Sequence, residues 1–245
     1  MRAVRALARL LRVLVHCLHG WLVIRLRFPV LSADQQGLRV QLWSAQLLQL
    51  LGIGLRVEGT PPVVGPVLLV SNHISWLDIA TLHAARHCRF VSKADVRRWP
   101  LIGTLATGAG TLYIERESRR DAMRVVHQMA DRLRQADILA IFPEGTTSNG
   151  IDLLPFHANL IQAAISAGAP VQPVALRFVD TASGQTTLAP CYVGDDSLLG
   201  SLWRTVTAPP ITAVVRYGAL QRADGRERRA WAADLHAAVA ALRTG

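Results

Sequence analysis

The spacing of hydrophobic and polar positions changes several times along the 245 residues. Apolar runs of strand length alternate with stretches in which apolar residues recur every three or four positions. This alternation predicts an α/β fold whose mostly parallel central sheet is covered by helices. The expected strands are residues 63–70, 88–92, 111–115, 137–142, 171–178 and 211–217. The expected helices around them are residues 75–85, 118–135, 157–167 and 227–243.

The first 27 residues are arginine-rich at both ends and apolar between. The apolar run, residues 13–24, contains His16 and His19 and is shorter than the ~20 apolar residues of a single-pass helix. No small-residue cleavage site of a signal peptide follows it. We therefore expect a retained helix that lies in, or dips into, the membrane interface, with arginines at the headgroups. An ordinary buried amphipathic helix is the alternative.

A second helix is expected at residues 40–51, after a break at SADQQG. The two helices would form a hairpin that holds the protein on the bilayer. Gly52 and Gly54 follow and mark the entry to the main domain. The pattern thus divides the chain into an N-terminal helical membrane-associating segment, residues 1–54, and a main domain, residues 55–245.

Composition agrees with a membrane partner. Hydrophobic residues make up 51% of the chain, the mean hydropathy is +0.26 and the net charge is +10. Basic and apolar character together favour an anionic lipid surface, whereas nucleic acid would account for the charge alone. We therefore expect no nucleic-acid partner. The three cysteines, Cys17, Cys88 and Cys191, are far apart and odd in number, which indicates a reducing compartment.

The first chemically suggestive segment is SNHISWLD, residues 71–78. His73 follows an expected strand, at the sheet edge where open α/β sheets bind ligands. Asp78 comes five residues later and could accept a hydrogen bond from one ring nitrogen. It would then fix the tautomer and leave the other nitrogen free as a base. Alternatively, Ser75 and Asp78 form a helix capping box, and both interpretations can hold together.

The second segment is FPEGTTSNG, residues 142–150, directly after another expected strand. Pro143 and Gly145 would shape a tight turn that presents Glu144 at the same edge as His73. Backbone amides and hydroxyls there could hold a phosphate or a developing oxyanion. The hydroxyls belong to Thr146, Thr147 and Ser148. A surface turn that caps a helix is the alternative.

Four segments in order resemble the glycerolipid acyltransferase family, which includes the 1-acylglycerol-3-phosphate acyltransferases. The first is N-H-x(4)-D and the third is F-P-E-G-T. The second places a Gly before an apolar stretch and an Arg, and the fourth is an apolar strand with a central Pro. The matching residues are Asn72, His73 and Asp78; Gly110, Ile114 and Arg116; Phe142 to Thr146; and Val171, Pro173 and Val174.

The resemblance implies an acyltransferase domain that moves a fatty acyl chain from acyl-CoA or acyl carrier protein to the hydroxyl of a lysolipid. His73 would be the general base, oriented by Asp78. No metal, cofactor or acyl-enzyme would be needed. The implied location is the cytoplasmic face of the inner membrane, with peripheral or monotopic attachment. The implied substrate-binding residues are Lys93, Arg116, Glu144, Gly145 and Thr146.

One position departs from the family pattern. Thr147 stands where members that form phosphatidic acid usually carry an Arg, which suits a phosphate better. The expected acceptor is 1-acyl-sn-glycerol-3-phosphate, and lyso-ornithine lipid or another lysophospholipid is the alternative. Two other classes stay open on the residues alone. One is a hydrolase that uses the same pair on water, and the other is a basic membrane- or nucleic-acid-binding protein without catalysis.

Overall fold

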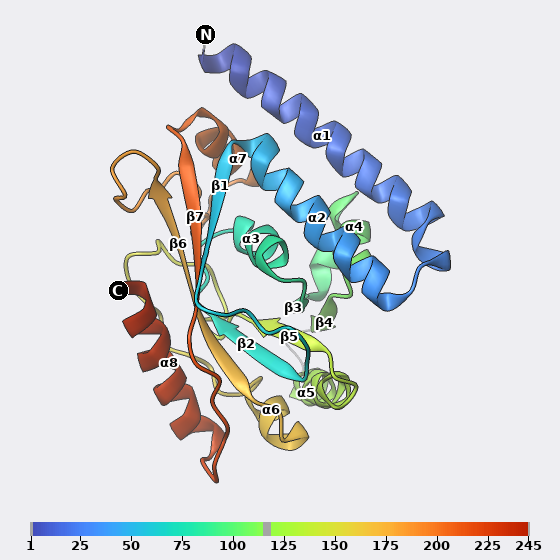
Figure 1. Cartoon of the computed structure of the whole chain (residues 1–245), viewed down its shortest axis with the longest axis vertical. Helices are drawn as coiled ribbons and strands as arrows, with labels where there is room; N and C mark the ends of the chain where they lie inside the picture. The colour runs from blue at the N-terminus through green and yellow to red at the C-terminus, as the bar shows by residue number, and fades with distance from the viewer. Residues whose placement is uncertain (1, 115–118, 245) are drawn as a thin grey trace.

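The computed structural model describes residues 2–114 and 119–244, which form a seven-stranded sheet between layers of helices (Figure 1). The strand order is β1-β7-β6-β2-β5-β3-β4, and only β6 and β7 pair antiparallel. The mostly parallel sheet is thus confirmed. The strands are β1 Ile53–Glu58, β2 Val67–Ser71, β3 Arg89–Lys93, β4 Leu112–Ile114, β5 Ile138–Ile141, β6 Val171–Asp180 and β7 Ile211–Tyr217.

Successive side chains of the central strands point to opposite faces and build two separate cores. In β2, Val67 and Leu69 belong to one core, whereas Leu68 and Val70 belong to the other. All four side chains are buried. This double burial explains why the central strands are continuous apolar runs rather than alternating ones.

Helices cover both faces of the sheet. One face carries α1 Arg2–Leu26, α2 Ala33–Leu51, α3 Leu77–Ala85 and α7 Leu198–Thr207. The other face carries α5 Arg119–Arg134, α6 Gln162–Ala167 and α8 Arg228–Thr244. Short connecting elements are η1 Phe28–Val30, η2 Ala94–Arg98 and α4 Ile102–Gly108. In Figure 1, α1 and α8 lie at opposite sides of the molecule, with the sheet and α3 between them.

Several expected elements begin later than the pattern indicated. The strand expected at 63–70 begins at Val67, because Val63 and Val64 are exposed and Pro66 has no N–H to donate. The helix expected at 157–167 begins at Gln162. By contrast, β7 has the expected bounds.

The structure contains elements that the pattern did not indicate. β1 pairs in parallel with β7, although two of its residues are a glycine, Gly54, and the exposed Arg56. The expected division between residues 54 and 55 therefore falls inside a strand of the main sheet. The helices α4 and α7 were also missed.

The expected break at SADQQG is wrong, because α2 begins at Ala33. The Ser32 side chain accepts from the Gln35 backbone N–H at 3.3 Å, and the Gln35 side chain accepts from the Ser32 N–H at 3.0 Å. This capping box starts the helix where polar residues indicated a loop. Gly37, inside the helix, allows the ring of His87 to approach: an added Cβ would lie 2.7 Å from its Cδ2.

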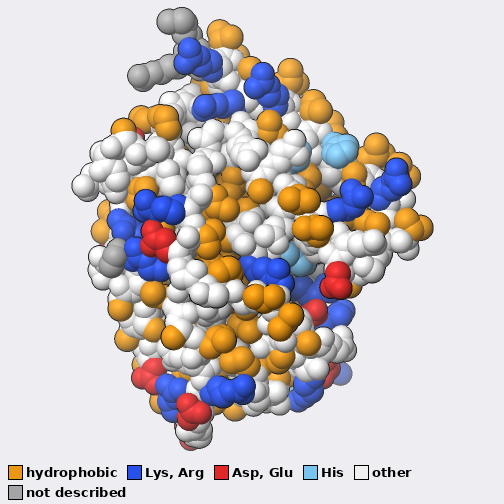
Figure 2. Space-filling view, viewed as in Figure 1, with side chains coloured by type: hydrophobic (Ala, Val, Ile, Leu, Met, Phe, Trp, Pro, Cys, Tyr) orange, Lys and Arg blue, Asp and Glu red, His pale blue; other side chains and the backbone are white. Residues whose placement is uncertain are grey.

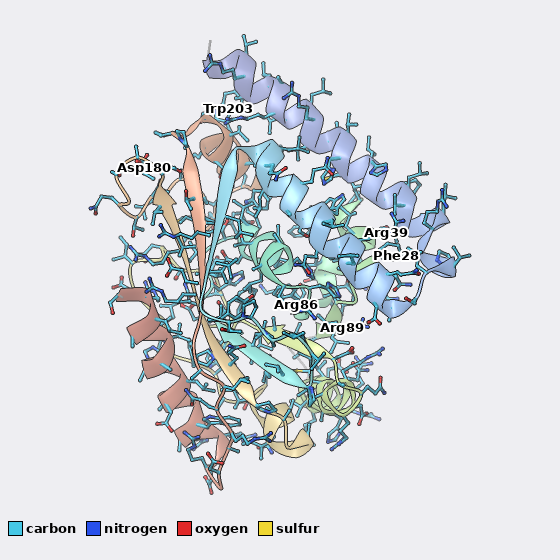
Figure 3. All side chains as sticks on the ribbon, in the orientation of Figure 1. Phe28, Arg39, Arg86, Arg89, Asp180 and Trp203 are labelled. Carbon is cyan, nitrogen blue, oxygen red and sulfur yellow. The ribbon has the colours of Figure 1, made fainter. Side chains whose placement is uncertain are left out.

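One side of α1 packs on the protein. The His16 ring stacks on Trp43 of α2 with 4.7 Å between centroids, and its Nε2 lies 2.9 Å from the Trp43 carbonyl oxygen. Gly20 permits this contact, since a Cβ there would lie 2.5 Å from the indole nitrogen of Trp43. The N-terminal half of α1 lies beside α7, which carries Trp203 (Figure 3).

The other side of α1 is apolar and exposed. Figure 2 shows hydrophobic side chains with arginines between them along this margin of the molecule. By length and composition α1 could cross a membrane, and only 11% of its most apolar window is buried. An ordinary buried helix therefore does not describe α1. The exposed aliphatic residues are Val4, Leu7, Leu11, Leu14, Val15, Leu18, Leu22 and Leu26.

Candidate active site

The loop that carries His73 is fixed at the carboxyl end of β2. The preceding residue, Asn72, is buried and reaches across to β6. Its side-chain amide donates to the Leu176 carbonyl at 3.0 Å, and its side-chain oxygen accepts from the Leu176 N–H at 2.7 Å. These two bonds hold the end of β2 to β6, so that His73 leaves the sheet in a defined direction.

His73 and Asp78 are brought together as expected. Nδ1 of His73 lies 2.7 Å from Oδ2 of Asp78, which is fully buried in the first turn of α3. A buried carboxylate in this position accepts a hydrogen bond from Nδ1–H, which favours the tautomer whose Nε2 carries no hydrogen. The His73 side chain is 19% exposed, and Nε2 has no hydrogen-bond partner among the described residues. The pair therefore has the geometry of an oriented general base.

The capping interpretation holds in part. Oδ2 of Asp78 also accepts the backbone N–H groups of Ile74 and Ser75, at 2.6 and 2.9 Å. The capping box is incomplete, because the Asp78 N–H donates to the Ser75 carbonyl at 3.2 Å rather than to the Ser75 hydroxyl. That hydroxyl instead accepts from the Leu77 N–H at 3.3 Å and donates to the Pro190 carbonyl at 2.5 Å. One carboxylate oxygen thus shapes the loop and orients the imidazole.

The FPEGTTSNG segment holds the main chain of His73 from both sides. Oε1 of Glu144 accepts the His73 N–H at 2.6 Å, and the Ser148 N–H donates to the His73 carbonyl at 2.8 Å. Oε2 of Glu144 accepts the Leu154 N–H at 2.9 Å. Both oxygens of this buried carboxylate are therefore engaged within the protein. Glu144 thus positions the main chain of His73, in addition to its expected role in binding substrate. Its contact with substrate stays a prediction.

Burial raises the pKa of the Glu144 carboxyl, and the N–H groups of His73 and Leu154 oppose this change. The positive charge of Arg243 opposes it too. Arg243 comes from the last turn of α8, and its guanidinium donates to the carbonyls of Gly150 and Ile151 at 2.6 and 2.9 Å. Nothing in the sequence pattern placed this arginine at the site, because 93 residues separate it from Gly150.

Phe142 supplies an aromatic face to His73. The two rings lie nearly parallel, with 4.0 Å between centroids and 8° between planes. Phe90 of β3 stacks on Phe142 at 5.6 Å and meets the buried His83 edge-on at 4.9 Å. The sequence identified Phe142 only as the first letter of a motif, and gave no sign of this stack.

The hydroxyls of the turn do not all face a ligand. The Thr147 hydroxyl donates to the Tyr192 carbonyl, and the Ser148 hydroxyl donates to the His73 carbonyl at 3.1 Å. Thr146 is exposed and makes no hydrogen bond with a described residue. Gly145 has φ +73°, a left-handed conformation that favours glycine. The hydroxyls of Thr147 and Ser148 are thus engaged within the protein, and their contact with a substrate stays a prediction.

Of the two cationic side chains expected near the site, the structure describes Lys93 alone. Arg116 lies outside the described residues. Lys93 ends β3, is exposed, and pairs in register with Ile114, two positions before Arg116. Among the described residues no group of three or more His, Cys, Asp or Glu side chains could hold a metal ion.

Residues 54–177 match the family model described as Acyltransferase. The chain is 43% identical to lyso-ornithine lipid O-acyltransferase of Pseudomonas aeruginosa over 76% of this chain and 71% of that protein. It is 41% identical to 1-acyl-sn-glycerol-3-phosphate acyltransferase of Neisseria gonorrhoeae over 69% and 66%, respectively. The solved 1-acyl-sn-glycerophosphate acyltransferase of Thermotoga maritima shares the fold, with a TM-score of 0.69 and 17% identity over 96% of each chain. The chain belongs to the acyltransferase family.

Proposed function

We propose that this acyltransferase moves a fatty acyl group from a thioester, acyl-CoA or acyl carrier protein, to the free hydroxyl of a lysolipid. The His73–Asp78 pair carries the proposal, because the contact of Nδ1 with Asp78 leaves Nε2 without a partner among the described residues at the ligand edge of the sheet. The names of the two relatives above support a lysolipid as acceptor.

The proposed step begins when Nε2 of His73 takes the proton of the acceptor hydroxyl. The oxygen attacks the thioester carbonyl carbon, a C–O bond forms and the C–S bond breaks. The leaving thiolate takes the proton back from the imidazolium, which Asp78 stabilises meanwhile. The products are an ester and a free thiol. This step requires no metal, no cofactor and no covalent acyl-enzyme.

The acceptor we propose first is 1-acyl-sn-glycerol-3-phosphate, which would give phosphatidic acid. Arg116 and Lys93 are its expected phosphate contacts, with Gly145 and Thr146 beside them. One observation favours lyso-ornithine lipid as a second candidate. Thr147 replaces a cation and directs its hydroxyl to the Tyr192 carbonyl, so this position offers no charge to a phosphate.

The exposed apolar side of α1 supports membrane association. Aliphatic residues there would enter the acyl region while the arginines of the helix meet anionic headgroups. We place the enzyme on the cytoplasmic face of the inner membrane, where acyl-CoA and acyl carrier protein are available.

An assay with purified protein in detergent tests the proposal. Labelled acyl donor is supplied with 1-acyl-sn-glycerol-3-phosphate and with lyso-ornithine lipid in parallel, and mass spectrometry identifies the product. His73→Ala should abolish transfer, whereas His127→Ala, at an exposed position on α5, should retain it. Equal activity of His73→Ala and the unaltered enzyme would rule out the proposed mechanism.

A further inference from the structure

A basic hollow lies beside the FPEGTTSNG loop, between residues 155–159 and α8. Its volume is about 530 Å³. Arg228 and Arg229 line it together with the imidazoles of His157 and His236. No acidic side chain is among the described residues that line it. The hollow therefore combines room for a small group with a positive surface.

The positive charge of this hollow is not neutralised within the protein. Arg228 and Arg229 are both exposed, and neither forms an ion pair or a hydrogen bond with a described residue. A second hollow, lined by Arg226 and Asp224, differs in this respect. There, Arg226 forms ion pairs with Asp224 and Asp234 at 3.7 and 2.7 Å. Uncompensated arginines in a concave surface attract anions, and phosphate above all.

The basic hollow adjoins the candidate active site. The His157 N–H donates to the Pro143 carbonyl at 2.8 Å. The His157 ring lies close to Gly145, where an added Cβ would be 3.2 Å from Cδ2. Glu144, between Pro143 and Gly145, holds the His73 main chain. A ligand bound in the hollow would therefore lie next to His157, which contacts the two neighbours of Glu144 in the FPEGTTSNG loop.

The hollow is also on the side from which a water-soluble substrate would come. It lies against α8, and α8 covers the sheet face opposite to α1 and α2 (Figures 1 and 3). A lysolipid would reach His73 from the side of α1. Both proposed donors are water-soluble, and both carry the acyl group on a pantetheine arm that ends in a phosphate.

We propose that the basic hollow binds the phosphate at the end of the donor's pantetheine arm, with Arg228 and Arg229 as its cationic contacts. The arm then passes Gly145 and delivers the thioester to His73. This site rests on the proposed function, because that function supplies the donor.

The test compares Arg228→Gln/Arg229→Gln with the unaltered protein, as full chains in detergent. Arg124→Gln/Arg134→Gln is the matched control, since it removes the same charge from exposed positions on α5. The donors are acyl-CoA, acyl carrier protein and acyl-pantetheine, which lacks the phosphate. We expect the variant to raise KM at least tenfold for both phosphate-bearing donors. KM for acyl-pantetheine and for the lysolipid should not change, and the control should behave like the unaltered protein.

Each outcome decides the proposal. A rise with both donors supports the site for the shared pantetheine phosphate. A rise with acyl-CoA alone would overturn it, because the nucleotide phosphates of coenzyme A would then be the ligand. An unchanged KM for both, or an equal rise for acyl-pantetheine, would overturn the site. So would a rise with acyl carrier protein alone, because an acidic protein surface would then be the ligand.

Calorimetric titration with free coenzyme A separates this site from the proposed reaction. The unaltered protein should bind coenzyme A at least tenfold more tightly than Arg228→Gln/Arg229→Gln. If no acyl transfer occurs but this difference is found, the proposed function fails and the phosphate site stands. Equal binding by both proteins would remove the site even if acyl transfer is observed.

Discussion

Oδ2 of Asp78 accepts from Nδ1 of His73 at 2.7 Å while it also accepts the N–H groups of Ile74 and Ser75. One oxygen thus sets both the direction of the imidazole and the conformation of the loop that carries it. The other oxygen, Oδ1, is buried and has no hydrogen-bond partner among the described residues. A substitution that changes Oδ2 would therefore disturb three hydrogen bonds, whereas one that changes Oδ1 would disturb none among the described residues.

Asp78→Asn should separate orientation from charge. An asparagine oxygen can keep the three hydrogen bonds of Oδ2, and its amide can occupy the unpartnered position of Oδ1. The fold should therefore persist, but the imidazolium loses its counter-charge. We expect kcat to fall by roughly 10²–10⁴-fold, with the KM for lysolipid little changed. Steady-state kinetics measure this, Asp152→Asn on the exposed loop serves as control, and an unchanged kcat would contradict the orienting role.

Phe142→Leu should weaken the base without unfolding the site. The Phe142 ring lies parallel to His73 at 4.0 Å, so an imidazolium formed during the reaction would lie over its π face. Such contacts contribute roughly 0.5–2 kcal/mol, which corresponds to a fall in kcat of about 2- to 30-fold. Phe142→Trp should restore much of the activity. Phe90→Leu, which contacts Phe142 rather than His73, should have a smaller effect; a larger one would show that packing dominates.

Glu144→Gln should change how stability depends on pH. Burial raises the pKa of Glu144, so the folded protein binds this proton more tightly than the unfolded chain does. The group therefore favours folding below its ordinary carboxyl pKa, and this contribution is lost as pH rises through the raised pKa. Glutamine removes that dependence, although one N–H loses its acceptor at a cost of about 1–3 kcal/mol.

Urea unfolding at a series of pH values measures the effect. The free energy of unfolding of Glu144→Gln, relative to the unaltered protein, should increase as pH rises from about 4 to about 7. Asp152→Asn again serves as the control at an exposed carboxylate. A difference between Glu144→Gln and the unaltered protein that stays constant over this range would show that Glu144 does not titrate there.

Leu14→Glu/Leu18→Glu should release the protein from membranes. Both leucines belong to the exposed side of α1, so the substitutions leave its contacts with α2 intact. Charges there would prevent insertion of the apolar face, and we expect affinity for anionic vesicles to fall at least tenfold. Co-sedimentation measures this. Met123→Glu/Leu220→Glu adds the same charge at exposed apolar positions away from α1 and should bind normally; equal loss in both variants would indicate a charge effect alone.

Much of the fold follows from local pattern. The strand at 211–217 and the last helix were predictable because their apolar residues recur with a clear period. β1 was not, since its Gly54 and exposed Arg56 obscure the strand pattern and only pairing with β7 makes it a strand. The start of α2 was missed because the polar residues Ser32 to Gln35 are compatible with either a loop or a capping box.

The sequence by itself determined the alternation of strands and helices, the basic apolar helix at the start of the chain, and the His73–Asp78 pair. These features depend on residues close in the chain, where spacing already limits which side chains can meet. Only the tertiary structure decided that Glu144 holds His73, that Phe142 lies on its ring, and that α8 reaches the same loop. Those contacts join segments some 70 to 90 residues apart. Their formation depends on how the sheet orders its strands, because packing across layers leaves no periodic signal in the chain.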